Sequence, residues 1–71
     1  MDVASVRLEA VVIEAISSAQ FQVELPNGRQ LSARVSGQIR MHFIRIVPGD
    51  RVTVELSPLD PYQARIVHKN S

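Results

Sequence analysis

Arginines are the residues of this 71-residue chain whose type and spacing best suit ligand binding. The segment between Gly28 and Gly49 has no acidic residue. It contains four arginines: Arg29, Arg34, Arg40 and Arg45. A planar guanidinium matches phosphate oxygens and stacks on bases, so this cluster suits a phosphate-rich partner such as RNA. A solvated sheet face that is merely basic is the alternative, and charge alone leaves both interpretations open.

Charge is unevenly distributed along the chain. Residues 1–27 carry one basic and four acidic residues, whereas residues 28–71 carry seven basic and three acidic ones. The net charge is only +1, so the basic character belongs to the second half of the chain rather than to the whole.

Arg40 and Arg45 lie five residues apart, in a predicted short helix and its exit, so both could face one side. They would then clamp phosphates and stack on RNA bases, or else form a solvated surface pair. Phe43 between them either stacks on a base or docks the helix on the rest of the domain. His42 would add a pH-dependent positive charge to the same segment.

Catalytic and metal-binding patterns do not emerge from the sequence. Cysteine is absent, which excludes disulfides and thiolate metal sites. His42 and His68 are far apart in sequence and have no clustered carboxylates near them. Serines are plentiful, but no serine–histidine–acid or paired-carboxylate pattern accompanies them. We therefore expect no enzyme activity, no cofactor and no metal.

Five stretches of alternating apolar and polar residues predict β-strands. Pro26-Asn27-Gly28 between the second and third stretches is a strong hairpin signal. Residues 57–61 contain two prolines and predict a loop. Tyr62, between Pro61 and Gln63, would be a loop anchor. Phe21 alternates with glutamines and is predicted to be in the core. The predicted strands cover about nine residues from Val6, then 20–25, 30–35, 51–56 and about 63–69.

Residues 36–46 lose the period of two and predict one or two helical turns. Ser36 is a plausible N-cap, and Ile39 and Phe43 stand at i and i+4. A helix this short is marginal alone, so it must dock on the sheet through those two side chains. Five strands with a short helix between the third and fourth is the OB arrangement; a small SH3-like barrel competes but offers no place for the helix. We expect one all-β domain over 1–71, with flexible ends at 1–5 and 70–71.

Three segments carry a resemblance to a known family: VELPNGRQLSARVSGQIR, HFIRIVPGDRVTVELSPLD and ARIVHK. Together they resemble bacterial translation initiation factor 1, over about Val6 to Lys69. The resemblance implies an S1-like OB barrel that binds the A site of the small (30S) ribosomal subunit. It also implies contacts with 16S ribosomal RNA, and promotion of initiation complex formation with initiation factors two and three.

Carried over to this sequence, the resemblance and the basic pattern give a set of candidate RNA-binding residues. The family often has lysine where Gln38 and Met41 stand, tyrosine at Phe43, and glycine at Ala10 and Ala64. This chain is therefore less basic than is typical, as a divergent second version of the factor would be. The candidates are Arg29, Arg34, Arg40, His42, Phe43, Arg45, Arg65 and Lys69.

Two other functions remain open at this point. A general single-stranded RNA-binding protein or RNA chaperone would use the same basic face without a fixed site, and an interaction module would bind no RNA. The longest apolar run is Ala10 to Ile13, far below the roughly 20 residues of a membrane span, and no signal peptide is visible. We expect a monomer in the cytoplasm that does not enter membranes.

Overall fold

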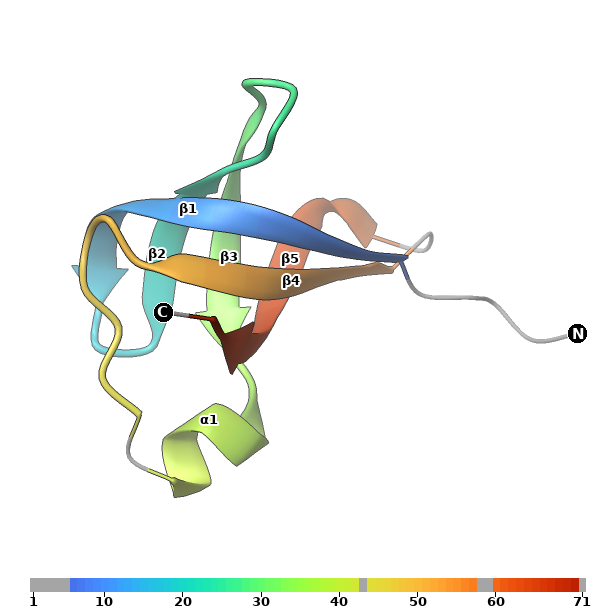
Figure 1. The fold of residues 1–71 in the computed structure, drawn as a ribbon. Helices are drawn as coiled ribbons and strands as arrows, with labels where there is room; N and C mark the ends of the chain where they lie inside the picture. The colour runs from blue at the N-terminus through green and yellow to red at the C-terminus, as the bar shows by residue number, and fades with distance from the viewer. Residues whose placement is uncertain (1–5, 43, 58–59, 71) are drawn as a thin grey trace, which may run out of the picture.

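The structure is a computed structural model and describes residues 6–42, 44–57 and 60–70. Its strands form a closed barrel in the order β1-β2-β3-β5-β4, with β3 and β5 parallel and the other neighbours antiparallel (Figure 1). This confirms the predicted five-stranded OB barrel with a helix between the third and fourth strands. The elements are β1 (Val6–Ser17), β2 (Gln20–Glu24), β3 (Gln30–Val35), α1 (Gly37–Met41), β4 (Arg51–Ser57) and β5 (Asp60–Lys69).

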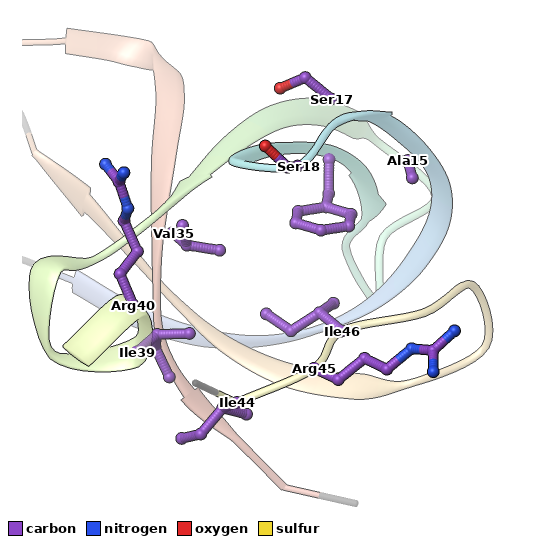
Figure 2. Close-up of a pocket in the computed structure, with 10 residues that line it drawn as sticks. Ala15, Ser17, Ser18, Val35, Ile39, Arg40, Ile44, Arg45 and Ile46 are labelled. Atoms are coloured by element: carbon purple, nitrogen blue, oxygen red, sulfur yellow. The ribbon is translucent and has the colours of Figure 1, made fainter. Parts of the chain in front are cut away.

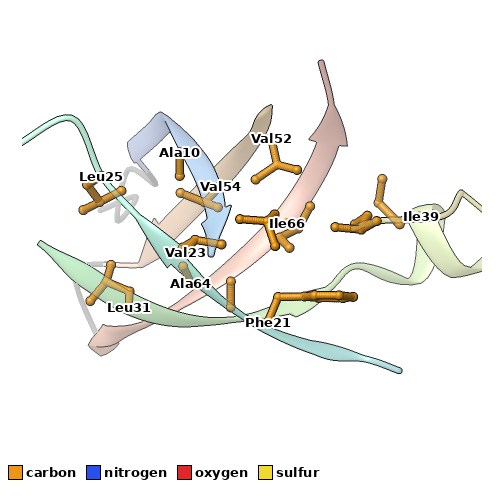
Figure 3. Close-up of a cluster of buried hydrophobic side chains, with 13 residues drawn as sticks. Ala10, Phe21, Val23, Leu25, Leu31, Ile39, Val52, Val54, Ala64 and Ile66 are labelled. Atoms are coloured by element: carbon orange, nitrogen blue, oxygen red, sulfur yellow. The ribbon is translucent and has the colours of Figure 1, made fainter. Parts of the chain in front are cut away.

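Apolar and polar residues alternate along the strands, and the apolar ones fill the barrel with aliphatic side chains and one phenylalanine (Figure 3). Phe21 is buried, as predicted, and Ile66 is fully buried beside the exposed Arg65. Burying one face of each strand while the other meets solvent is what a period of two produces. The buried set comprises Ala10, Val12, Phe21, Val23, Leu25, Leu31, Ala33, Ile39, Ile46, Val52, Val54, Ala64 and Ile66.

Strand β1 is longer than predicted because it serves two neighbours. Its first half pairs with β4 and its second half with β2, and the pairing with β2 contains two register shifts. Such bulges bend a strand, which allows β1 to pass from one side of the barrel to the other. Val11 and Ile13 are about two-fifths exposed near the bend, in agreement with the expectation that the strand is apolar on both faces there.

The hairpin between β2 and β3 forms where Pro26-Asn27-Gly28 predicts it. Gly28 has a φ of 86°, and its amide donates to the Leu25 carbonyl oxygen at 2.9 Å. Oδ1 of Asn27 accepts from the amide of Arg29 at 2.9 Å. A residue with a side chain is strained at this φ, so the turn requires glycine.

Replacing Gly28 by alanine is expected to cost roughly 1–2 kcal/mol of folding free energy, because alanine must adopt the left-handed region. A domain of this size then melts roughly 5–10 °C lower. Gly37→Ala is the matched control, since a Cβ there meets no atom within 4 Å and its φ is not positive. Thermal unfolding of both variants decides: equal melting temperatures would contradict the account of the turn.

Strand β5 begins earlier than predicted. It starts at Asp60 rather than near Gln63, and its first residue pairs with Ser57 of β4 after a register shift. Proline is tolerated near the start of a strand, where a missing N–H costs little, so Pro61 does not exclude β structure. The prediction of a loop over 57–61 was therefore wrong for Asp60 and Pro61, and Tyr62 lies in the strand. Residues 58–59 lie outside the described part of the chain.

The helix α1 is as short as predicted, and it is stabilised by an N-cap and by one buried side chain. Oγ of Ser36 accepts from the Ile39 amide at 3.3 Å, which confirms the N-cap. Ile39 is buried against the barrel core (Figure 3). Within the described residues, no helix is long and apolar enough to cross a membrane.

Candidate nucleic-acid interface

Arg34 and Arg40 lie together at the end of the barrel that carries α1. Arg34 points outward from β3, and Arg40 is exposed in the last turn of the helix. Both line a hollow of about 340 Å³ with Ser17, Ala19 and Gln20. The short connection from β3 to α1 therefore brings the two guanidinium-bearing side chains to one surface.

Arg45 extends this surface across a second, larger hollow of about 630 Å³. Figure 2 shows Arg40 and Arg45 on opposite sides of it, with Ile39, Ile44 and Ile46 between them. Within the described part of the chain, every charged residue that lines either hollow is an arginine. Apolar walls between two guanidinium groups suit a ligand with flat, weakly polar rings and phosphate groups.

Arg65 joins the same surface through strand register. It is the cross-strand partner of Arg34 in the parallel β3–β5 pair, and its side chain is 61% exposed. Its Nη2 lies 3.5 Å from Oε1 of Glu55 on β4. We name Arg34, Arg40, Arg45 and Arg65 the basic rim.

The segment that carries Arg45 is held by a polar clamp. The Val47 amide donates to Oδ2 of Asp50 at 2.9 Å, and the same carboxylate oxygen lies 3.3 Å from Nζ of Lys69. Nζ of Lys69 also donates to the backbone oxygen of Arg45 at 2.8 Å. The Val47 hydrogen bond, followed by the Lys69 interaction, lowers the pKa of Asp50 below its ordinary value of 3.8 despite an opposing effect of burial.

A pH titration tests the clamp. The folded-state pKa of Asp50 is lower than its unfolded value, so its contribution to stability is present above about pH 4 and is lost as the pH falls through the folded-state pKa. We expect urea unfolding to give a constant free-energy difference between the wild type and Asp50→Asn at pH 5–7 and a shrinking difference down to pH 2.5. A difference that is the same at pH 7 and pH 2.5 would contradict this role.

The remaining candidate RNA-binding residues do not belong to the basic rim. Arg29 is in the β2–β3 hairpin, at the opposite end of the barrel from α1 (Figure 1), where its carbonyl accepts from Leu25 at 2.8 Å. His42 caps the C-terminus of α1 and is exposed beside the rim. Lys69 is part of the clamp, and Phe43 lies outside the described residues.

Sequence reasoning did not single out Arg7, whose Nε lies 3.2 Å from Oε2 of Glu55. Outward alternation on β1 places it on the surface, but only the register of β1 against β4 shows its partner. Among the described residues, no group of three or more histidine, aspartate or glutamate side chains is arranged to hold a metal.

A model of the family described as "Translation initiation factor 1A / IF-1" matches residues 3–71. The chain belongs to this family. The resemblance carried by the hairpin, the helix segment and the last strands is therefore confirmed, and with it the assignment to translation initiation and RNA binding.

Solved structures agree with the family assignment. The solution structure of translation initiation factor 1 from the Wolbachia endosymbiont strain TRS of Brugia malayi is 35% identical, with a TM-score of 0.79. The match covers 94% of this chain and 79% of that one. The crystal structure of YjeQ from Thermotoga maritima, at 21% identity and a TM-score of 0.77, matches 93% of this chain and 23% of its own, and it shows a shared fold alone.

Proposed function

We propose that this member of the translation initiation factor 1A / IF-1 family binds the A site of the small ribosomal subunit. The basic rim contacts phosphates of 16S ribosomal RNA, and with initiation factors two and three the bound chain promotes formation of the initiation complex. The observation that carries the proposal is the clustering of exposed Arg34, Arg40 and Arg45 around two hollows whose lining has no acidic residue in the described chain.

The members of the candidate set contribute differently in this proposal. Arg34, Arg40, Arg45 and Arg65 are the phosphate contacts, and the candidates His42 and Phe43 follow Arg40 closely in the sequence. Arg29 contacts RNA separately from the rim, because the hairpin is at the far end of the barrel. Lys69 acts by holding the backbone of Arg45 rather than by direct contact, since its ammonium already has two oxygen partners.

Binding to isolated small subunits, with competition by an A-site ligand, tests the proposal. We expect saturable binding that the ligand displaces, because both occupy one site. Equal affinity for unrelated single-stranded RNA would favour a general RNA chaperone instead. Absence of binding to either would leave an interaction module without RNA contact.

A further inference from the structure

A row of charged residues crosses the outer face of four strands. Arg7 on β1 is the register partner of Glu55 on β4. Glu55 is in turn paired with Arg65 on β5, and Arg65 is paired with Arg34 on β3. Register partners on neighbouring strands point to the same face of a sheet. Three arginines and one glutamate therefore stand side by side, and two of these arginines, Arg34 and Arg65, belong to the basic rim.

Glu55 is shared between two of these arginines. Its Oε2 lies 3.2 Å from Nε of Arg7, and its Oε1 lies 3.5 Å from Nη2 of Arg65. The glutamate side chain is only 19% exposed, whereas the side chains of Arg7 and Arg65 are 68% and 61% exposed. The carboxylate is thus largely shielded from solvent, while the two guanidinium-bearing side chains beside it are largely exposed and open to an incoming anion.

An open hollow of about 750 Å³ lies beside this row, which gives a phosphate group space to approach. Arg7, Glu55 and Arg65 line it together with Thr53 and His68. A carboxylate and a phosphate offer a guanidinium the same kind of acceptor oxygens, so they compete for it.

We propose that Glu55 is an internal counter-ion that competes with RNA phosphates for Arg7 and Arg65 and so limits the affinity of the chain for RNA. This inference rests on the proposed function and adds Arg7 to its RNA-binding surface. Two effects of Glu55 oppose each other: it orients the arginines, and it repels a phosphate that approaches them. The two arginine side chains are largely exposed, so the ion pairs orient them only weakly. A like charge a few ångströms from the phosphate lies well within the screening length, so repulsion dominates.

Neutralising Glu55 is therefore expected to strengthen binding. At about 0.1 M salt, Glu55→Gln should bind isolated small subunits about three- to tenfold more tightly than the wild type. Glu24→Gln is the matched control, because it removes the same charge about 13 Å along a strand from the row, beyond the screening length of about 10 Å. We expect its affinity to change by less than about twofold.

A double-mutant cycle between Glu55 and the two arginines distinguishes competition with phosphate from a structural role of Glu55. In an Arg7→Ala, Arg65→Ala background, Glu55→Gln should no longer tighten binding, because the competed groups are gone. Thermal unfolding confirms that each variant is folded, and Glu55→Ala provides a second neutral variant. Unchanged or weaker binding by folded Glu55→Gln, with wild-type binding intact, would overturn the inference. Wild-type chain that fails to bind small subunits would instead overturn the proposed function.

Discussion

Replacing Arg40 and Arg45 together by alanine is expected to weaken binding to isolated small ribosomal subunits by more than about tenfold. Hydrogen bonds to charged groups contribute about 1.5–3 kcal/mol each, and 1.4 kcal/mol corresponds to a tenfold change in affinity. The two side chains stand on opposite sides of one hollow, so their removal takes both charged walls from the same ligand (Figure 2). Equilibrium titration with a fluorescently labelled chain measures the loss.

Arg51→Ala serves as the control for this double substitution. Arg51 is also exposed, but it lines a different hollow, with Glu9 and Glu24 on β1 and β2. We expect its loss to change the affinity by less than about threefold, because long-range attraction is largely screened at physiological salt. Equal effects of the control and the double variant would show that net charge, rather than the position of the basic rim, determines binding.

Salt should weaken the complex steeply. If the four arginines of the basic rim each contact one phosphate, log affinity falls with log salt at a slope near −3, at about 0.7–0.9 per contact. Between 50 and 200 mM salt the affinity is then expected to drop about 60-fold. The reason is counterion release: each phosphate that an arginine neutralises sets free a condensed cation, and added salt opposes that release.

The same salt titration with the Arg40→Ala, Arg45→Ala variant connects the slope to particular residues. Loss of two contacts should reduce the slope to about half of the wild-type value, whereas Arg51→Ala should leave it unchanged. A wild-type slope shallower than about −1 would contradict a phosphate interface of this size.

Local signals explain why most of the fold was predictable from the sequence. Asn27 and Gly28 determine the hairpin through backbone preferences of adjacent residues, and Ser36 caps α1 through a hydrogen bond three residues away. Phe21 follows the period of two that places it in the barrel. Each of these features depends on residues that are close in the sequence, so a short stretch of sequence is enough to predict it.

Features that depend on pairing between distant segments were predicted less well. The bulges in β1 arise because one strand serves two partners, and the early start of β5 depends on β4. Contacts in the candidate site were likewise not predicted where they join residues far apart in the sequence. Lys69 holds the backbone of a residue 24 positions away, and Arg7 meets Glu55 across 48 positions. Neither the clamp nor the shared glutamate has a signature in a single sequence.

Cleavage of ribosomal RNA from a tethered probe would locate the surface of the chain that faces the A site. The chain has no cysteine, so one introduced cysteine carries a hydroxyl-radical source at a single known place. Met41→Cys puts the source beside Arg40 at a residue that is 72% exposed, and Glu24→Cys puts it at an exposed position near the hairpin. We predict that the probe at position 41 cleaves 16S ribosomal RNA at the A site most strongly. Stronger A-site cleavage from position 24, or none from position 41, would contradict the basic rim as the ribosome-binding surface.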